Sequence, residues 1–185
     1  FEADAYAWRM KKLAGFAPKV ITGVDVQECE PILGPKIQCL AVLEGQGHIT
    51  NPGEYITELT RYFTKNGGSF VQAEVRDFQK MDGRISRIET DQGTFECSKA
   101  VITAGIWSKE LMKRLNLRVP LETERGYHVI FENPSEVPRN PMMVTAGKFG
   151  VNPMDMGLRC AGTLELGDHH AGPSKAPIAL LMRRA

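Results

Sequence analysis

Hydrophobic and polar residues follow two different periods along this chain of 185 residues. A period of three to four residues, typical of a helix with one apolar face, predicts helices over 1–14, 51–66 and 107–115. Residues 24–35 are expected to form a short helix and a turn, which Pro31, Gly34 and Pro35 break. Alternation, or a short β-branched run between turn residues, predicts strands over 37–43, 69–78, 85–90, 94–97, 101–103, 123–131, 142–145, 149–154 and 158–166. Close-spaced strands and interspersed helices indicate an α+β fold with antiparallel sheets.

The helix over 51–66 has the clearest boundaries. Asn51 is a favourable N-cap, Pro52 suits the first helical position, and Glu54 stands where a capping box has its acidic residue. Gly15 is expected to end the first helix, and Asp25 to cap the second. One face of the 51–66 helix is formed by Ile56, Leu59, Thr60 and Phe63.

Composition and charge narrow the classes of function. Hydrophobic residues make up 42% of the chain and charged residues 24%, which are values of a globular protein rather than a disordered one. The net charge is +1 and no Lys/Arg run is dense enough for a nucleic-acid surface, so small-molecule chemistry or protein contact is expected. Four cysteines, at 29, 39, 97 and 160, form no Cys-x-x-Cys pair. This spacing indicates neither a zinc site nor a disulfide framework, and it fits a cytoplasmic location.

Neither a membrane span nor a signal peptide is predicted. No apolar run approaches the ~20 residues of a spanning helix, and the first residues are amphipathic, with Glu2, Asp4 and Arg9 among them. Peripheral contact with the inner membrane stays open. The chain does not begin with Met and stops in the apolar run 176–182, so we expect both ends to be cut and segment 178–182 to leave a face for self-association.

Three short motifs follow one another in an informative order. Ala100–Ser108 is a β-branched run that ends in Ala-Gly and enters a helical pattern, and Arg125–Val129 and Gly157–Glu165 follow it. In this order, and over about residues 36–165, the chain resembles the middle of the D-amino-acid oxidase superfamily of FAD-dependent amine oxidoreductases. The nearest branch is that of bacterial D-amino-acid dehydrogenase and glycine oxidase.

The resemblance implies FAD as the cofactor, contacted by Val75, Ala104, Gly105 and Trp107. The backbone of Val75 would bracket the adenine. Gly105 would let the backbone approach the ribityl-pyrophosphate region, and helix N–H groups from Ile106 onward would face the phosphates. The alternatives are an ordinary sheet valine at 75 and a strand-to-helix turn with Trp107 as a core anchor.

The resemblance also implies an amino-acid substrate, with Tyr127, Arg125 and His128 in its pocket. On an alternating strand Arg125 and Tyr127 share one face, whereas His128 lies on the other, where a structural or solvated role is its alternative.

Arg159 belongs to the same implied pocket, in a strand that lines the substrate cavity of such enzymes. By alternation Thr163 and Glu165 share its face, and an ion pair between Glu165 and Arg159 is the plain alternative for both. The pair His169-His170 is interpreted as a polar loop, and no metal site is predicted.

The resemblance divides the chain into 1–47, a substrate-domain part with a leading helix, 48–115, a part of the FAD-binding α/β domain, and 116–185, an antiparallel substrate-domain sheet. The chain contains no Gly-x-Gly-x-x-Gly dinucleotide motif. The family's Trp-x-Gly-x-Arg-Pro segment, whose arginine clamps the substrate carboxylate, would begin after Ala185. We therefore expect that this chain alone neither holds FAD firmly nor turns over substrate.

The implied activity is FAD-dependent oxidation of the CH–NH group of a D-amino acid or glycine-like substrate to an imine, which hydrolyses to a 2-oxo acid and ammonia. No protein residue is predicted to be catalytic, because the flavin accepts the hydride. A secondary-amine oxidase of the sarcosine or proline type is the alternative enzyme. A non-catalytic assembly module, or a subunit of a hetero-oligomeric dehydrogenase, is the alternative from another class. The substrate side chain and the electron acceptor, oxygen or a quinone, are left open.

Overall fold

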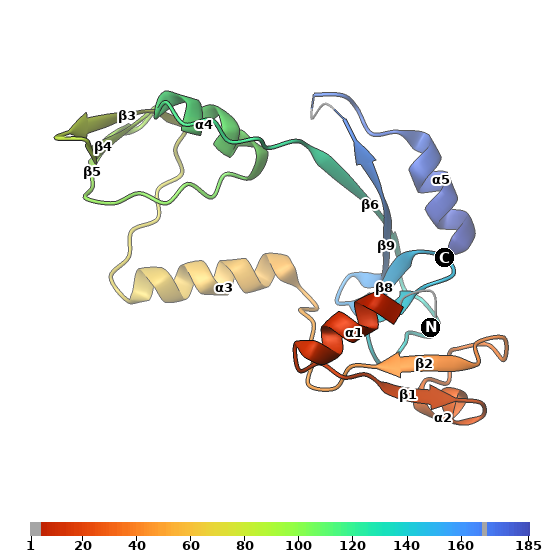
Figure 1. Ribbon diagram of the computed structural model, residues 1–185. Coiled ribbons are helices and arrows are strands. Elements are labelled where there is room, and N and C mark those ends of the chain that lie inside the picture. Colours follow the sequence, from red (N-terminus) through yellow and green to blue (C-terminus); the bar gives the residue numbers. More distant parts are fainter. Residues whose placement is uncertain (1–4, 168–169) are drawn as a thin grey trace. The chain divides into compact units, whose positions relative to one another are not determined.

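The computed structural model describes residues 5–167 and 170–185 (Figure 1). The chain divides into two compact units, and each is described by itself. The first unit comprises the chain up to residue 55 together with 126–163 and 174–185, and the second comprises 56–125 and 164–173.

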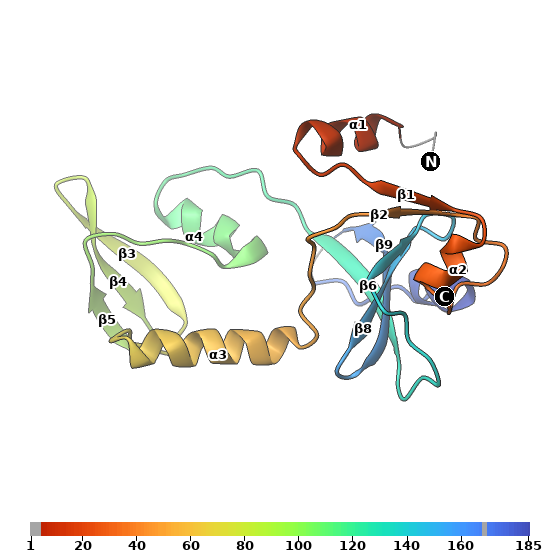
Figure 2. The same cartoon turned by 90° about the horizontal axis from the view of Figure 1, so that it is seen from below.

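Among the described residues the first unit contains a two-stranded sheet, a four-stranded sheet and three helices. Figures 1 and 2 show these elements from two sides. Its elements are α1 (Ala5–Leu13), β1 (Lys19–Thr22), α2 (Asp25–Cys29), β2 (Cys39–Val42), most of β6 (Glu124–Phe131), β7 (Met142–Val144), β8 (Phe149–Met154), most of β9 (Gly157–Leu166) and α5 (Lys175–Arg184). Strands β1 and β2 pair antiparallel, and the larger sheet has the order β6-β9-β8-β7, in which β7–β8 and β8–β9 are antiparallel.

The core of the first unit lies between this sheet and α5. Phe149 and Val151 of β8, Cys160 of β9 and Leu181 of α5 form one buried cluster. Val129, Val144 and Leu158 pack against it. Because Val151 pairs with Cys160 across the two strands, the cluster defines the sheet face that α5 covers.

The second unit is built around a three-stranded meander. Its elements are α3 (Pro52–Lys65, from residue 56 onward), β3 (Val75–Met81), β4 (Arg84–Thr90), β5 (Gly93–Glu96), the 3₁₀ turn η2 (Gly105–Trp107) and α4 (Ser108–Arg114). Asp82 and Gly83, with φ of 52° and 76°, make the tight turn between β3 and β4. Lys80 Nζ donates to the Leu115 carbonyl at 3.1 Å and ties β3 to the end of α4.

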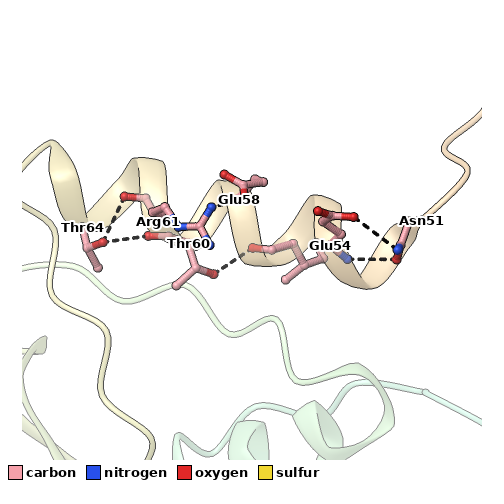
Figure 3. Close-up of polar contacts among 7 residues, drawn as sticks. Asn51, Glu54, Glu58, Thr60, Arg61 and Thr64 are labelled. Carbon is pink, nitrogen blue, oxygen red and sulfur yellow. Dashed lines mark hydrogen bonds and ion pairs between the residues drawn. The ribbon is translucent and has the colours of Figure 1, made fainter.

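Helix α3 begins as the sequence predicts (Figure 3). The Glu54 N–H donates to Asn51 Oδ1 at 3.1 Å, and the Asn51 side-chain amide donates to the Glu54 carboxylate at 3.3 Å. Its apolar face, however, has no core beneath it, because Ile56, Leu59 and Phe63 are 59%, 46% and 53% exposed. The hydrophobic pattern predicted the helix correctly, but the apolar face that it defines is not buried among the described residues.

Among the described residues most predicted elements are confirmed within two or three residues, including the strands at 85–90, 94–97, 123–131, 142–145, 149–154 and 158–166. Gly15 ends α1 at φ 87°, and residues 1–4 of the first predicted helix lie outside the described residues. The prediction of strand over 69–74 and 101–103 was wrong. A strand exists only where a neighbour takes its backbone hydrogen bonds, and neither stretch has a ladder partner among the described residues.

Three further differences concern strand β1, residue Asp25 and the end of the chain. The strand β1 was not predicted, although its Val-Ile-Thr run is β-branched. Asp25 does not cap α2, because the helix begins at Asp25 itself and its N-cap is Val24, with no side-chain cap. The apolar segment 178–182, expected to leave an exposed face, lies in α5, where Leu181 is 2% exposed and part of the core while Met182 is 61% exposed.

Candidate functional site

The predicted substrate-side residues lie on β6 and β9, which are neighbours in one sheet. Tyr127 has the parity of Val129, which packs on the core, and is 6% exposed. Its hydroxyl accepts a hydrogen bond from the Ser174 N–H at 2.8 Å. Tyr127 is therefore a buried residue bound to the backbone that enters α5.

Arg125 is half-buried, and its guanidinium is engaged by the chain itself. Nη1 donates to the Gly172 carbonyl at 2.9 Å, and Nη2 donates to the Ala171 carbonyl. The Glu165 carboxylate lies 3.8 Å from Nη1. The ion pair that the sequence suggested between Glu165 and Arg159 is thus found between Glu165 and Arg125.

Arg159 and His128 lie on the other face of the sheet. Each is next in sequence to a residue of the core-facing side, Cys160 or Val129, so alternation turns both away from α5. His128 is exposed, as its alternative interpretation requires. Arg159 is half-buried, and its side chain makes no hydrogen bond or ion pair within the described part of the chain.

Alternation counted from Arg159 does not predict correctly which face of the sheet carries Glu165. Thr163 has φ 64°, a left-handed conformation that a β-branched residue rarely adopts, and it interrupts the alternation of β9. Residues beyond it therefore change phase relative to Arg159. Glu165 accordingly pairs with Arg125.

Asn152 is a neighbour of Arg159 that the sequence analysis missed. It stands directly opposite Arg159 in the β8–β9 register, and such pairs bring Cβ atoms to about 4.5–5.5 Å. The signal was present, because counting back from the turn that joins Met154 to Gly157 pairs 152 with 159. Arg159 and Asn152 together offer a cation and an amide on one face of the sheet.

The predicted flavin contacts all lie in the second unit, so the geometry of that unit can be compared with what a flavin nucleotide requires. Val75 opens β3, an edge strand of the meander, so one side of its backbone has no ladder neighbour among the described residues. Gly105 has φ 56°, and a Cβ added there would meet nothing within 4 Å. At both positions the backbone is therefore open on one side within the described residues.

The helix start after Gly105 is less open than the sequence predicts. The Ala104 N–H donates to Ser108 Oγ at 3.0 Å, and the Trp107 N–H donates to the Ala104 carbonyl at 3.2 Å. These two amides are therefore taken, and the chain enters α4 through a 3₁₀ turn. Trp107 is 66% exposed, so within the described residues it anchors no core.

No enclosed cavity joins the four predicted FAD contacts within the described residues. Two hollows are lined by other residues, one by Thr123, Arg125, Glu165, Gly167 and Ala171, the other by Glu30, Pro31, Ile32, Glu136, Val137 and Arg139. In the second hollow the buried Glu30 carboxylate accepts the Arg139 N–H at 3.0 Å, so its contact is structural. Neither of these hollows contains Val75, Ala104, Gly105 or Trp107, so the FAD contacts stay a prediction.

Among the described residues no three His, Cys, Asp or Glu side chains gather closely enough for a metal ion. His170 is exposed, whereas His169 lies outside the described residues. In the part of the chain that the structure describes, every helix is too short or too polar to span a bilayer.

Comparison with known proteins agrees with this fold. The DAO family, described as FAD dependent oxidoreductase, matches residues 2–185. The chain is 34% identical to a D-amino-acid oxidase of Bradyrhizobium diazoefficiens, over 90% of this chain and 40% of that protein. It is 26% identical to a glycine oxidase of Pseudomonas putida, over 96% of this chain and 47% of that protein.

A solved structure shows the same arrangement of elements. Glycine oxidase from Geobacillus kaustophilus superposes with a TM-score of 0.81 at 20% identity, covering 99% of this chain and 50% of that one. The chain thus spans about half the length of the proteins it matches. It belongs to the DAO family of FAD-dependent oxidoreductases.

Proposed function

We propose that the chain is part of an FAD-dependent enzyme that oxidises the CH–NH group of an amino acid, a D-amino acid or glycine, to an imine. The family match over residues 2–185 carries this proposal. The names of the two relatives, a D-amino-acid oxidase and a glycine oxidase, supply the substrate class. Residues 48–115 would contribute to the FAD domain, and 1–47 and 116–185 to the substrate domain.

Within the substrate domain we assign the substrate carboxylate to Arg159. A half-buried guanidinium without a partner in the described chain loses hydration and gains no compensating contact, so an anionic ligand would stabilise it. Asn152 opposite supports the same ligand with an amide, and His128 shares the face. Tyr127 and Arg125 would contribute to the proposed substrate region indirectly, because they hold the backbone of residues 171–174.

FAD, when bound, would supply the hydride acceptor, while the protein supplies position and electrostatics. On the protein side, the edge of β3 at Val75 and the open turn at Ala104-Gly105, with Trp107 after it, would each contact the nucleotide. These contacts need the remainder of the longer protein to enclose the cofactor, because the described residues alone do not.

The test is made on the longer protein that carries this segment. It is purified, its visible spectrum is recorded, and flavin bleaching without oxygen is followed with D-amino acids, glycine, sarcosine and L-proline. Bleaching by D-amino acids or glycine supports the proposal. Bleaching by sarcosine or proline alone identifies a secondary-amine oxidase, and a flavin-free protein that oxidises none of them contradicts the enzyme assignment.

The Arg159 assignment has its own measurement in the same protein. Arg159→Gln should raise the KM for the amino acid about 10- to 100-fold, the value of a hydrogen-bonded charge pair. Arg118→Gln is the matched control, since Arg118 is exposed. Equal KM values for the two variants would remove Arg159 from the substrate site.

A further inference from the structure

We propose that Arg125 is a positioning residue which, together with Tyr127 and Glu165, fixes the segment 171–174 that leads into α5. It follows, if the proposed function holds, that Arg125 does not bind the substrate carboxylate; the positioning role itself does not depend on that function. The assignment separates Arg125 from Arg159, two arginines that the sequence places in one pocket.

The first observation is how the guanidinium is used. Its two terminal nitrogens donate to the carbonyls of two successive residues, Gly172 at 2.9 Å and Ala171. An end-on bidentate contact with a substrate carboxylate would use the same two nitrogens. The Glu165 carboxylate at 3.8 Å adds a negative charge beside them, which disfavours a second anion.

The second observation concerns Tyr127, two residues further along β6. Its hydroxyl accepts the Ser174 N–H at 2.8 Å, and Ser174 is the residue before the first turn of α5. Tyr127 is 6% exposed, so this contact is shielded from water. Ser174 offers α5 no side-chain cap, and the contact with Tyr127 fixes its backbone in the extended conformation that precedes the helix.

The two contacts act on one short stretch of chain. Arg125 holds the carbonyls of 171 and 172, and Tyr127 holds the amide of 174, so four consecutive residues are fixed from both ends. Removal of either side chain should therefore loosen this stretch without removing a residue of the core cluster, which is formed by other side chains.

Proteolysis of the 185-residue chain tests the role of Arg125. Lys175 is exposed and directly follows the held stretch, so cleavage after it by an endoproteinase specific for lysine reports local opening. Arg125→Gln should speed this cleavage about 10-fold or more, the effect of losing hydrogen bonds to a charged group. Arg159→Gln, an arginine of the same sheet without a partner in the described chain, should leave it unchanged.

Cleavage after Lys175 at the same rate in Arg125→Gln and in the wild-type chain overturns the proposal. Should Arg125→Gln fail to fold by circular dichroism, Tyr127→Phe takes its place, because it removes one hydroxyl and keeps the ring. The exchange rate of the Ser174 amide should then rise about 10-fold. An unchanged rate also overturns the proposal.

A kinetic comparison separates positioning from substrate binding in the longer protein. A ligand of the carboxylate discriminates between an amino acid and its amide, in which a neutral group replaces the carboxylate, whereas a positioning residue affects both alike. Arg125→Gln should change the two KM values by the same factor, and Arg159→Gln should change that of the amino acid alone. A selective effect of Arg125→Gln contradicts the assignment. If the protein oxidises neither compound the proposed function fails, while the proteolysis result still decides the role of Arg125.

Discussion

Replacing Leu181 by alanine tests whether α5 is part of the core of the first unit. Leu181 is 2% exposed and meets Phe149, Val151 and Cys160 of the sheet. Leu181 is the residue that α5 contributes to this buried cluster. Its truncation therefore leaves a cavity between the helix and the sheet, which the close-packed strands cannot easily fill.

The expected cost follows from two contributions. Full burial of a leucine side chain stabilises the folded state by about 1.5–3 kcal/mol relative to exposure. The cavity adds to this, and leucine-to-alanine changes at buried sites cost about 2–5 kcal/mol in all. Because β8 and β9 are held in register on the far side of the cavity, we expect about 3–4 kcal/mol for Leu181→Ala.

The assay is urea unfolding followed by circular dichroism, with alkylation of Cys160 as a second probe inside the same cluster. Met182→Ala is the matched control: the adjacent residue in the same helix is 61% exposed, so its truncation should change stability by no more than about 0.5 kcal/mol. Equal losses in the two variants, or a loss below about 1 kcal/mol for Leu181→Ala, would refute the packing of α5 described here.

Three further expectations concern a cap, a carboxylate and the thiols. Asn51→Ala should cost about 1 kcal/mol in urea unfolding and Asn51→Asp much less, because Asn51 Oδ1 caps the Glu54 N–H; equal losses contradict this. The Glu74 N–H lowers the pKa of the exposed Asp91 carboxyl, so its stabilisation is present above the unfolded pKa and is lost as the pH falls through the folded pKa. Nuclear magnetic resonance titration should show the low pKa, and Asp91→Asn should abolish this pH dependence of stability. Burial raises the pKa of the Cys160 thiol, so iodoacetamide at pH 8 should label the exposed Cys39 first, and equal labelling by mass spectrometry contradicts this.

The sequence predicts the hairpins well because their turns are chemically specific. Asp82-Gly83 and Gly93 adopt the positive φ values that these residues tolerate, so each turn fixes where two strands begin and end. Residues 101–103 have an equally β-branched pattern and form no strand. The difference is a partner strand, which the local pattern does not encode.

The candidate site shows the same limit at the level of single side chains. Alternation along β6 gave Arg125 and Tyr127 one face, and the burial of the strand agrees with it. What occupies their polar atoms, the carbonyls of 171 and 172 and the amide of 174, lies 46 or 47 residues away in sequence. Alternation also failed at Thr163, because its left-handed conformation shifts the phase of β9.

Two leucines show why a hydrophobic pattern predicts an element more firmly than its role. Leu59 of α3 and Leu181 of α5 both stand at apolar positions of helices, yet they are 46% and 2% exposed. Helix α3 has a cap and regular helical spacing, which are local and act without a partner. Leu181 is buried only because strands that precede it in the sequence present Phe149, Val151 and Cys160 beneath it. The period of the pattern therefore defines the face that a helix can bury, and the topology decides whether anything covers that face.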